Sequence, residues 1–374
     1  MGFNCTLAFP KTIIYCMLTL GVISSHEDPR IPLVPETIDK FIKLGATINY
    51  EKGCGESAHI PDSTFTGKVQ FMSREQVLQS ADLIMSALPP SGADLSNAKP
   101  GSVFLAMFAS FQNPAVVDPF KSKSLQAYSL DMIPRSSIAQ SMDVLSSMAS
   151  LAGYKAVLMA AGLLPRYFPM LMTASGTVKP AKVLVLGAGV AGLQAIATAR
   201  RLGAVIEVFD TRKAVKEEVE SLGAKFVEVE GAKDDKAAGG YAVEQTPEFL
   251  AKQRQLVQEK AAKSDVVICT AQIRGKKAPL LITAETLSNM RPGSVIIDLA
   301  SATGGNCEST IDGETKTIHG VTVVGNSFLA NTVAIDASFL LSNNYLNFLK
   351  ILIKDGNIKF DASNEIINAT CLTK

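Results

Sequence analysis

Residues 182–210 read KVLVLGAGVAGLQAIATARRLGAVIEVFD, in which a glycine-rich segment joins a short apolar run to a helical pattern and a second apolar run. The run before the glycines predicts a buried strand, and the pattern after them predicts a helix. The joining residues are Gly187, Ala188, Gly189, Val190, Ala191 and Gly192. In such a unit the first glycine permits a tight turn, the second lets the backbone approach a pyrophosphate, and the third lets the helix pack closely on the strand. The stretch therefore predicts a Rossmann-type dinucleotide site.

Asp210 ends the second apolar run, 18 residues after Gly192. An acidic residue about 20 residues after the glycines accepts hydrogen bonds from a ribose and repels a 2′-phosphate, which favours NAD over NADP. Thr211 and Arg212 complete the candidate cofactor contacts at this strand end. The positive charges of Arg212 and Lys213 weaken that preference, and a plain strand-end residue is the alternative for Asp210.

The two halves of the chain share three sequence patterns. The first half contains LGATINY (44–50), ADLIMSAL (81–88) and KPGSVFLAMFAS (99–110), and the second contains LGAVIEVFD (202–210), SDVVICTA (264–271) and RPGSVIIDLAS (291–301). In each half Leu-Gly-Ala ends a helix at its glycine, and Pro-Gly-Ser turns the chain into a strand. Helices that alternate with short Val/Ile/Leu runs are typical of parallel sheets. The sequence therefore predicts an α/β fold of two Rossmann-like, doubly wound parallel-sheet domains with a ligand cleft between them.

The expected first domain covers residues 1–145 plus 337–374, because the helical pattern from Ala337 onward would pack back on it. The expected NAD(H)-binding domain covers residues 146–336. A long helical pattern that begins after Pro134 would connect the two. Ala271 and Asp298 end later strands of the second domain and are further candidate cofactor contacts.

The composition excludes several classes of function. The 374 residues carry 36 Lys plus Arg against 35 Asp plus Glu, and this balance predicts no basic face for nucleic acid. The six cysteines form no CxxC pair and the three histidines share no ligand spacing, so the chain is expected to hold thiols and no metal. No stretch reaches about 18 uninterrupted apolar residues, which predicts a soluble chain that does not cross a membrane.

The apolar segment 12–24 has two interpretations. It follows a single lysine and precedes two serines, as the apolar core of a targeting segment does. A buried strand or helix is the alternative, and the sequence alone leaves both open.

Two polar segments carry candidate functional residues. In PRSSIAQSMDVLSS (134–147), a helix from about Ser137 would place Gln140 and Asp143 on one face, although Ser137 and Gln140 also fit a capping box. The segment 231–247 contains Gly239, Gly240 and Tyr241. It is either a solvated loop or a mobile lid that closes over the bound nucleotide.

The chain resembles the NAD(H)-binding component of the proton-translocating nicotinamide nucleotide transhydrogenases, which are related to alanine dehydrogenase. The similarity runs from about Asp28 to Lys374. It rests on PRSSIAQSMDVLSS (134–147), LAGYKAV (151–157), GAGVAGLQAIATARRLGA (187–204), GGYA (239–242), PGSVIIDLA (292–300) and GGN (304–306). The resemblance implies a homodimer that passes hydride from NAD(H) directly to NADP(H) on a partner component, while a membrane-spanning component moves protons. It also implies a place peripheral to an energy-transducing membrane, on the cytoplasmic side in a bacterium or the matrix side in a mitochondrion.

The same resemblance implies roles for individual residues. Arg135 would hold the nicotinamide carboxamide, and Gln140, Asp143 and Ser146 would form the loop that meets the nicotinamide at the partner interface. Tyr241 would lie on the mobile lid, and Asp210 would contact the adenosine ribose. Hydride transfer between two nicotinamides moves no proton, so the site needs alignment rather than a general acid or base.

The sequence departs from the family in four places. LAFPK at 7–11 resembles the family's first strand, but the loop after it is longer than usual. Ala330–Thr332 replaces a Pro-Ser-Arg turn, Arg274 replaces a proline, and Ala302 replaces a glutamate. These differences concern the geometry of nearby loops.

Two other functions are considered. An alanine dehydrogenase would need a lysine after the ADLI-type strand and a histidine after the PGSV-type strand, but the chain has Leu83–Ser86 and Leu105–Phe108 there. A non-catalytic NAD-responsive regulatory module would keep the glycine loop and need no residues for a second nucleotide.

Overall fold

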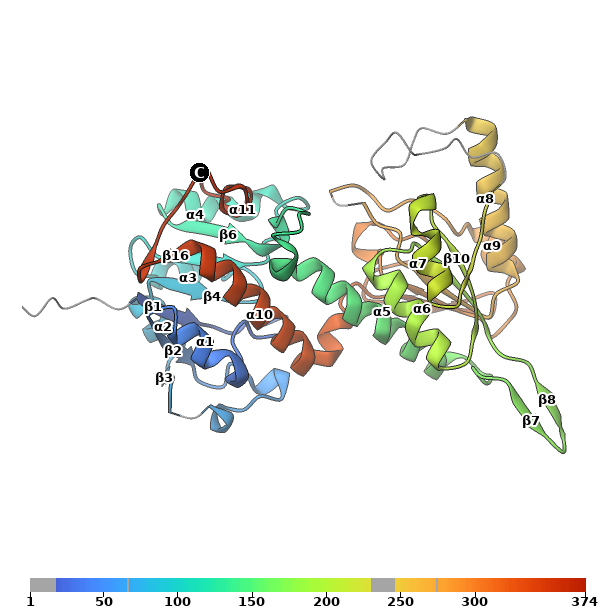
Figure 1. Ribbon diagram of the computed structural model, residues 1–374, viewed down its shortest axis with the longest axis horizontal. Helices are drawn as coiled ribbons and strands as arrows, with labels where there is room; N and C mark the ends of the chain where they lie inside the picture. The colour runs from blue at the N-terminus through green and yellow to red at the C-terminus, as the bar shows by residue number, and fades with distance from the viewer. Residues whose placement is uncertain (1–17, 66, 230–245, 274) are drawn as a thin grey trace, which may run out of the picture. The chain divides into compact units, whose positions relative to one another are not determined.

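The computed structural model describes residues 18–65, 67–229, 246–273 and 275–374 (Figure 1). The chain divides into two compact units. The first takes residues up to Phe108, Val116–Met142 and Ser342–Lys374, and the second takes Ala109–Ala115 and Asp143–Leu341. Ala109–Ala115, which the sequence places in the first domain, thus cluster with the second unit.

The first unit is built on a parallel sheet. Its strands are β1 (Leu18–Val22), β2 (Ala46–Glu51), β3 (Gln70–Met72), β4 (Leu83–Met85), β5 (Val103–Ala106) and β6 (Gln126–Ser129), in the order β3-β2-β1-β4-β5-β6. Its helices are α1 (Ile38–Ile42), α2 (Arg74–Ser80), α3 (Gly92–Asn97), α4 (Asp118–Ser122), α11 (Glu365–Thr370) and the part of α10 (Ala334–Leu352) from Ser342 onward. A short hairpin of β16 (Ile353–Lys354) and β17 (Asn357–Ile358) follows α10. The predicted turns are present, because Gly45 and Gly101 have φ of +83° and +77° before β2 and β5.

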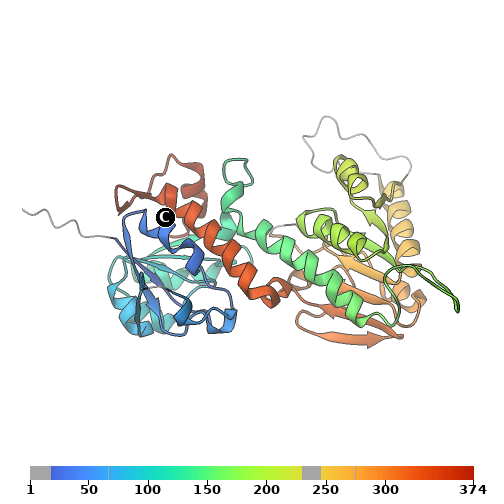
Figure 2. The same cartoon turned by 60° about the horizontal axis from the view of Figure 1, so that its bottom comes forward.

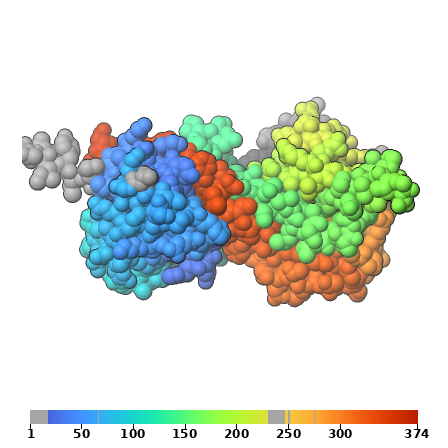
Figure 3. Space-filling model, turned by 90° about the horizontal axis from the view of Figure 1, so that it is seen from below, coloured from blue at the N-terminus to red at the C-terminus, as the bar shows by residue number. Residues whose placement is uncertain are grey.

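Helices α2, α3 and α4 cover one face of this sheet. Phe104 of β5 packs edge-on against Phe120 of α4, with ring centroids 5.3 Å apart. The last part of α10 lies against the same unit, seen in red beside the blue N-terminal elements in Figure 3. There the Tyr345 hydroxyl donates to the Ser86 carbonyl at 2.7 Å.

The second unit repeats this strand order. Its strands are β9 (Lys182–Leu186), β10 (Val205–Phe209), β11 (Lys225–Phe226), β12 (Val266–Cys269), β13 (Val295–Asp298), β15 (Val321–Gly325) and the antiparallel edge strand β14 (Thr315–Ile318), in the order β11-β10-β9-β12-β13-β15-β14. Its helices are α5 (Val144–Leu163), α6 (Val190–Arg201), α7 (Lys216–Ser221), α8 (Pro247–Ala262) and α9 (Ala284–Asn289). The parallel strands of both units therefore follow the doubly wound order 3-2-1-4-5-6, which confirms the predicted fold class.

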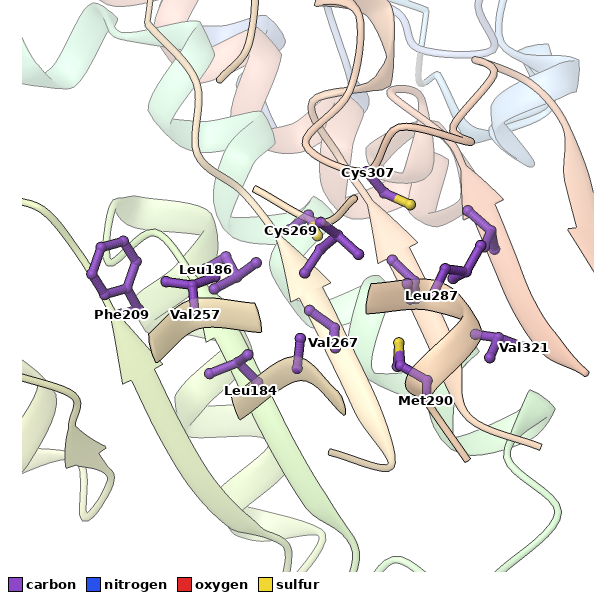
Figure 4. Close-up of a cluster of buried hydrophobic side chains, with 14 of the residues drawn as sticks. Leu184, Leu186, Phe209, Val257, Val267, Cys269, Leu287, Met290, Cys307 and Val321 are labelled. Carbon is purple, nitrogen blue, oxygen red and sulfur yellow. The ribbon is translucent and has the colours of Figure 1, made fainter. Parts of the chain in front are cut away.

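The core of the second unit lies between its sheet and two helices. Leu184 and Leu186 alternate along β9 with residues of the opposite face. They pack with Val267 and Cys269 of β12 against Val257 of α8, as Figure 4 shows. Burial on both faces explains why these strands read as continuous apolar runs.

The hairpin of β7 (Leu171–Thr173) and β8 (Gly176–Val178) projects from the rest of this unit in Figures 1 and 2. Nothing in the repeated sequence patterns predicts it. Its apolar residues Met172 and Val178 are 70% and 37% exposed, and Met170 before it is 58% exposed.

Segment 12–24 contains the first described strand. Leu18–Val22 form β1, which pairs with both β2 and β4 and lies inside the sheet. The buried-strand interpretation is therefore correct for these residues, while residues 12–17 lie outside the described part of the chain. The position of the first strand, which resemblance gave to residues 7–11, is occupied by Leu18–Val22.

Within the described ranges, α5 has the length and composition of a membrane-spanning helix, with a mean hydropathy of 1.4 over its most apolar window. The core helix of a soluble protein meets the same criteria. Here α5 packs against α6 through Gly153, where a Cβ would lie 2.1 Å from the carbonyl oxygen of Ala191.

Candidate dinucleotide site

The glycine-rich loop begins where β9 ends, at the point where the strand order of the second unit reverses between β9 and β12. Ligands of open parallel sheets bind at this point. Gly187 has a φ of +103°, a conformation that L side chains rarely adopt. A Cβ on Gly192 would lie 1.9 Å from the Gly187 carbonyl oxygen. The tight turn and the close packing therefore both require glycine.

Helix α6 begins without a side-chain cap. Its N-cap residue is Gly189, and no side chain accepts a hydrogen bond from the helix start. By contrast, α2, α3 and α5 begin under the side chains of Ser73, Ser91 and Asp143. A Cβ on Gly189 would meet no atom of the described residues within 4 Å. Free amide donors, a positive helix end and open space together fit the pyrophosphate of a dinucleotide.

Two residues outside the glycine motif fix the position of the loop. The Thr270 hydroxyl, just after β12, lies 3.1 Å from the Leu186 carbonyl oxygen and 3.0 Å from that of Gly187. Gly153 lets α5 approach the first turn of α6. Neither role is visible in the sequence, because each depends on a contact between elements far apart in the chain.

Asp210 lies beside this loop. Its carboxylate accepts the Ala188 N–H at 2.7 Å and the Arg212 N–H at 2.8 Å. The Arg212 guanidinium also donates to both carboxylate oxygens at 3.1 Å, and this hydrogen bonding raises the pKa of Arg212. The side chain of Asp210 is 8% exposed and that of Arg212 is 40% exposed. The acid is thus placed at the loop with its charge balanced by an arginine that solvent can reach.

Asp298 holds a loop of its own unit. It is fully buried at the end of β13 and accepts the N–H groups of Asn306 and Cys307 at 2.7 and 3.0 Å. The Thr310 hydroxyl donates to the same carboxylate at 2.8 Å. Burial raises the pKa of Asp298, although these hydrogen bonds oppose the shift. The carboxylate anchors the Gly-Gly-Asn turn.

Asn306 carries that anchoring to the strand end after β12. Its Nδ2 donates to the carbonyls of Ala271 and Pro279 at 2.8 Å, and its Oδ1 accepts the Ala271 N–H at 3.0 Å. The backbone of Ala271, a candidate cofactor contact, is therefore fixed by Asn306. The GGN motif contains this residue, but its role requires the folded loop.

The structure corrects the prediction for residues 137–147. No helix starts near Ser137, and Gln140–Met142 form a 3-10 turn instead. Helix α5 begins at Val144 with Asp143 as its N-cap, whose carboxylate accepts the Ser146 N–H at 3.0 Å and the Ser146 hydroxyl at 2.6 Å. Gln140 and Asp143 therefore do not share a helix face, and the expected capping box is replaced by an aspartate cap, which is a strong helix start.

Four of the first-half candidates have defined surroundings. Asp143 and Ser146 are joined by the cap, whereas Arg135 and Gln140 are exposed. Gly239, Gly240 and Tyr241 of the expected lid lie outside the described residues, as does Arg274.

The fold and the loop define a class of protein with two Rossmann-type units, the second of which carries a dinucleotide fingerprint. The N-terminal domain model of the alanine dehydrogenase/PNT family matches residues 23–152, and the C-terminal domain model matches residues 156–374. The chain therefore belongs to the alanine dehydrogenase/PNT family.

Its relatives include transhydrogenase subunits. The first of the separate chains that make up NAD(P) transhydrogenase subunit alpha in Rhodospirillum rubrum is 43% identical over 358 residues, which cover 93% of each chain. The crystal structure of a transhydrogenase from Sinorhizobium meliloti matches with a TM-score of 0.87 at 38% identity, covering 95% of this chain and 98% of that one. An L-alanine dehydrogenase structure shares the fold, with a TM-score of 0.75 at 22% identity over 94% of this chain and 93% of that one. The family resemblance inferred from the sequence motifs is confirmed.

Proposed function

We propose that this chain is the NAD(H)-binding component of a nicotinamide nucleotide transhydrogenase. The observation that carries the proposal is the uncapped start of α6, with open space at Gly189 and Asp210 beside it. The similarity to transhydrogenase alpha subunits supports it. In this function NADH bound at the loop supplies hydride to NADP⁺ on a partner component, and a membrane-spanning component couples transfer to proton movement.

The residues of this chain would bind and orient rather than exchange protons. The α6 N-terminus would hold the pyrophosphate, and Asp210 would accept hydrogen bonds from the adenosine ribose, with Arg212 free to turn toward solvent. Arg135 and Gln140, both exposed, would contact the nicotinamide. Tyr241 would close the lid. Alignment of two nicotinamides is the contribution that such a site makes to the rate.

The surroundings of the first-unit strand ends argue against an alanine dehydrogenase. Ser86 is buried and its hydroxyl donates to the Leu88 carbonyl at 2.6 Å, so it is engaged within the fold. Met107, after β5, is 9% exposed and carries no ionisable group. Neither could handle the acid group of a small substrate.

A homodimer is part of the proposal. The β7–β8 hairpin presents Met172 and Val178 away from its own unit, and exposed apolar residues on a projecting element are typical of a protein interface. A Met172→Lys variant is expected to shift the sedimentation coefficient toward that of a monomer. An unchanged coefficient would remove the hairpin from the interface.

The decisive test is a single-turnover assay of hydride transfer from NADH on this chain to an NADP analogue on a transhydrogenase partner. We expect transfer, and no oxidation of NADH with pyruvate plus ammonium. Robust turnover of pyruvate would establish the dehydrogenase instead, and NADH binding without any transfer would establish a regulatory module.

Gln140→Ala tests the alignment role within this assay. Because Gln140 is exposed and caps no helix, the thermal midpoint is expected to stay unchanged. The transfer rate is expected to fall by up to about a hundredfold, since misplacement by about 1 Å has that effect. Transfer at the normal rate would exclude Gln140 from the site.

A further inference from the structure

Two asparagines of α10 hold one carbonyl group of the loop that contains Gln140. Asn344 and Asn347 both donate from Nδ2 to the Ser141 carbonyl oxygen, at 2.9 and 3.2 Å. Helix residues three apart share a face, and a carbonyl has two lone pairs, so both bonds can form together. Ser141 is the middle residue of the 3-10 turn Gln140–Met142. All of these residues belong to the first unit.

Asn344 is an unusual residue for its position. It is 5% exposed in a run of buried α10 residues that includes Leu341 and Tyr345. Its Oδ1 is buried and has no hydrogen-bond partner in the described part of the chain. A buried acceptor without a partner is destabilising, and a leucine of similar size would avoid this. Packing of α10 therefore does not explain the amide, whereas the bond to Ser141 does.

Asn347 is oriented by a second contact. Its Oδ1 accepts a hydrogen bond from Lys350 Nζ at 2.9 Å, which directs its NH₂ group toward Ser141. Gln140 itself is exposed, so its placement depends on the backbone of the turn rather than on packing. The two amides thus fix the backbone beside the residue that the proposed function places at the nicotinamide.

We propose that Asn344 and Asn347 are positioning residues for hydride transfer, which act by holding the Ser141 carbonyl and with it the Gln140 side chain. This inference rests on the proposed function. The asparagines touch neither nucleotide, so their loss alters the transfer rate and leaves the NADH dissociation constant unchanged.

The test compares Asn344→Leu and Asn347→Ala with the control Asn357→Ala. Asn357 also donates its amide to a backbone carbonyl, that of Asp355 at 2.9 Å, but it lies in the β16–β17 turn. We expect Asn344→Leu to retain or raise the thermal midpoint, because the unpaired oxygen is removed. Its single-turnover transfer rate should fall at least about tenfold. Amide hydrogen exchange at Ala139 and Met142 should accelerate.

The control should change none of these quantities, and Asn347→Ala, at a half-buried position, should reproduce the loss of transfer if Asn344→Leu does not fold. Faster exchange with normal transfer would overturn the positioning role and leave the proposed function intact. Unchanged exchange would show that the amides do not hold the turn. Transfer that falls only in proportion to the folded fraction would reduce both residues to a structural role. Absence of transfer in the unmutated protein would instead defeat the proposed function, and this inference with it.

Discussion

Replacement of Gly153 with alanine tests how α5 places the dinucleotide loop. Alanine is favoured over glycine in a helix by about 1 kcal/mol, so helix propensity alone predicts stabilisation. A Cβ here would lie 2.1 Å from the carbonyl oxygen and 2.9 Å from the carbonyl carbon of Ala191. Both are backbone atoms, so the first turn of α6 must retreat by roughly 1 Å to reach ordinary contact.

Overpacking of this kind costs about 1–3 kcal/mol, of which the helix propensity offsets a part. We expect Gly153→Ala to lower the free energy of unfolding by about 1–2 kcal/mol, which corresponds to a thermal midpoint roughly 2–8 °C lower. NADH affinity should fall as well, because the displaced turn follows directly on Gly189.

Gly162 provides the matched control in the same helix. A Cβ at Gly162 would meet no described atom within 4 Å, so Gly162→Ala changes helix propensity alone. Its thermal midpoint should be equal or slightly higher, with unchanged NADH affinity. Thermal unfolding followed by circular dichroism and titration of NADH fluorescence measure both quantities. If Gly153→Ala melts and binds NADH as Gly162→Ala does, the contact does not position the loop.

Two further predictions concern charged groups. Asp210→Ala should weaken NADH binding and narrow the gap between NADH and NADPH, because the carboxylate both faces the ribose position and holds the Ala188 N–H; equal affinities of the unmutated protein for the two nucleotides would contradict the assignment. Burial alone raises the pKa of Asp94, but hydrogen bonds from Arg74 and Ser91 outweigh it and lower the pKa to about 2. The ion pair with Arg74 should therefore stabilise the fold fully above about pH 4 and lose on the order of 1 kcal/mol as the pH falls to about 2. Asp94→Asn should remove this acid dependence from denaturant titrations, and an unchanged dependence would assign it to other carboxylates.

The repeated patterns predicted the parallel strands because burial on both faces imposes apolar runs, and the chain reversals between them need glycine. Gly45 and Gly203 both have a φ of +83° at the ends of the predicted Leu-Gly-Ala helices. The start of α5 was predicted wrongly, since Ser137 and Asp143 are both plausible caps and only tertiary packing selects between them.

Other parts of the site have no signal in the sequence. The contacts of Thr270 and Asn306 join loops that are far apart along the chain. The antiparallel strand β14 and the β7–β8 hairpin lie outside the repeated pattern. Such features depend on which elements the fold brings together, and composition or periodicity does not report this.

The shared strand order of the two units makes each an internal reference for the other. In the second unit, the N–H of the second residue after β9 binds the acid that follows β10, in the pair Ala188 and Asp210. In the first unit, the N–H of the second residue after β1 binds the acid that ends β2, in the pair Ser24 and Glu51, at 2.7 Å. Glu51 also accepts from Arg74 at 2.9 Å, and no glycine loop or long helix follows β1. An acid tied to the first loop is therefore architecture that the two halves hold in common, and nucleotide specificity arises only where glycines and an uncapped helix accompany it.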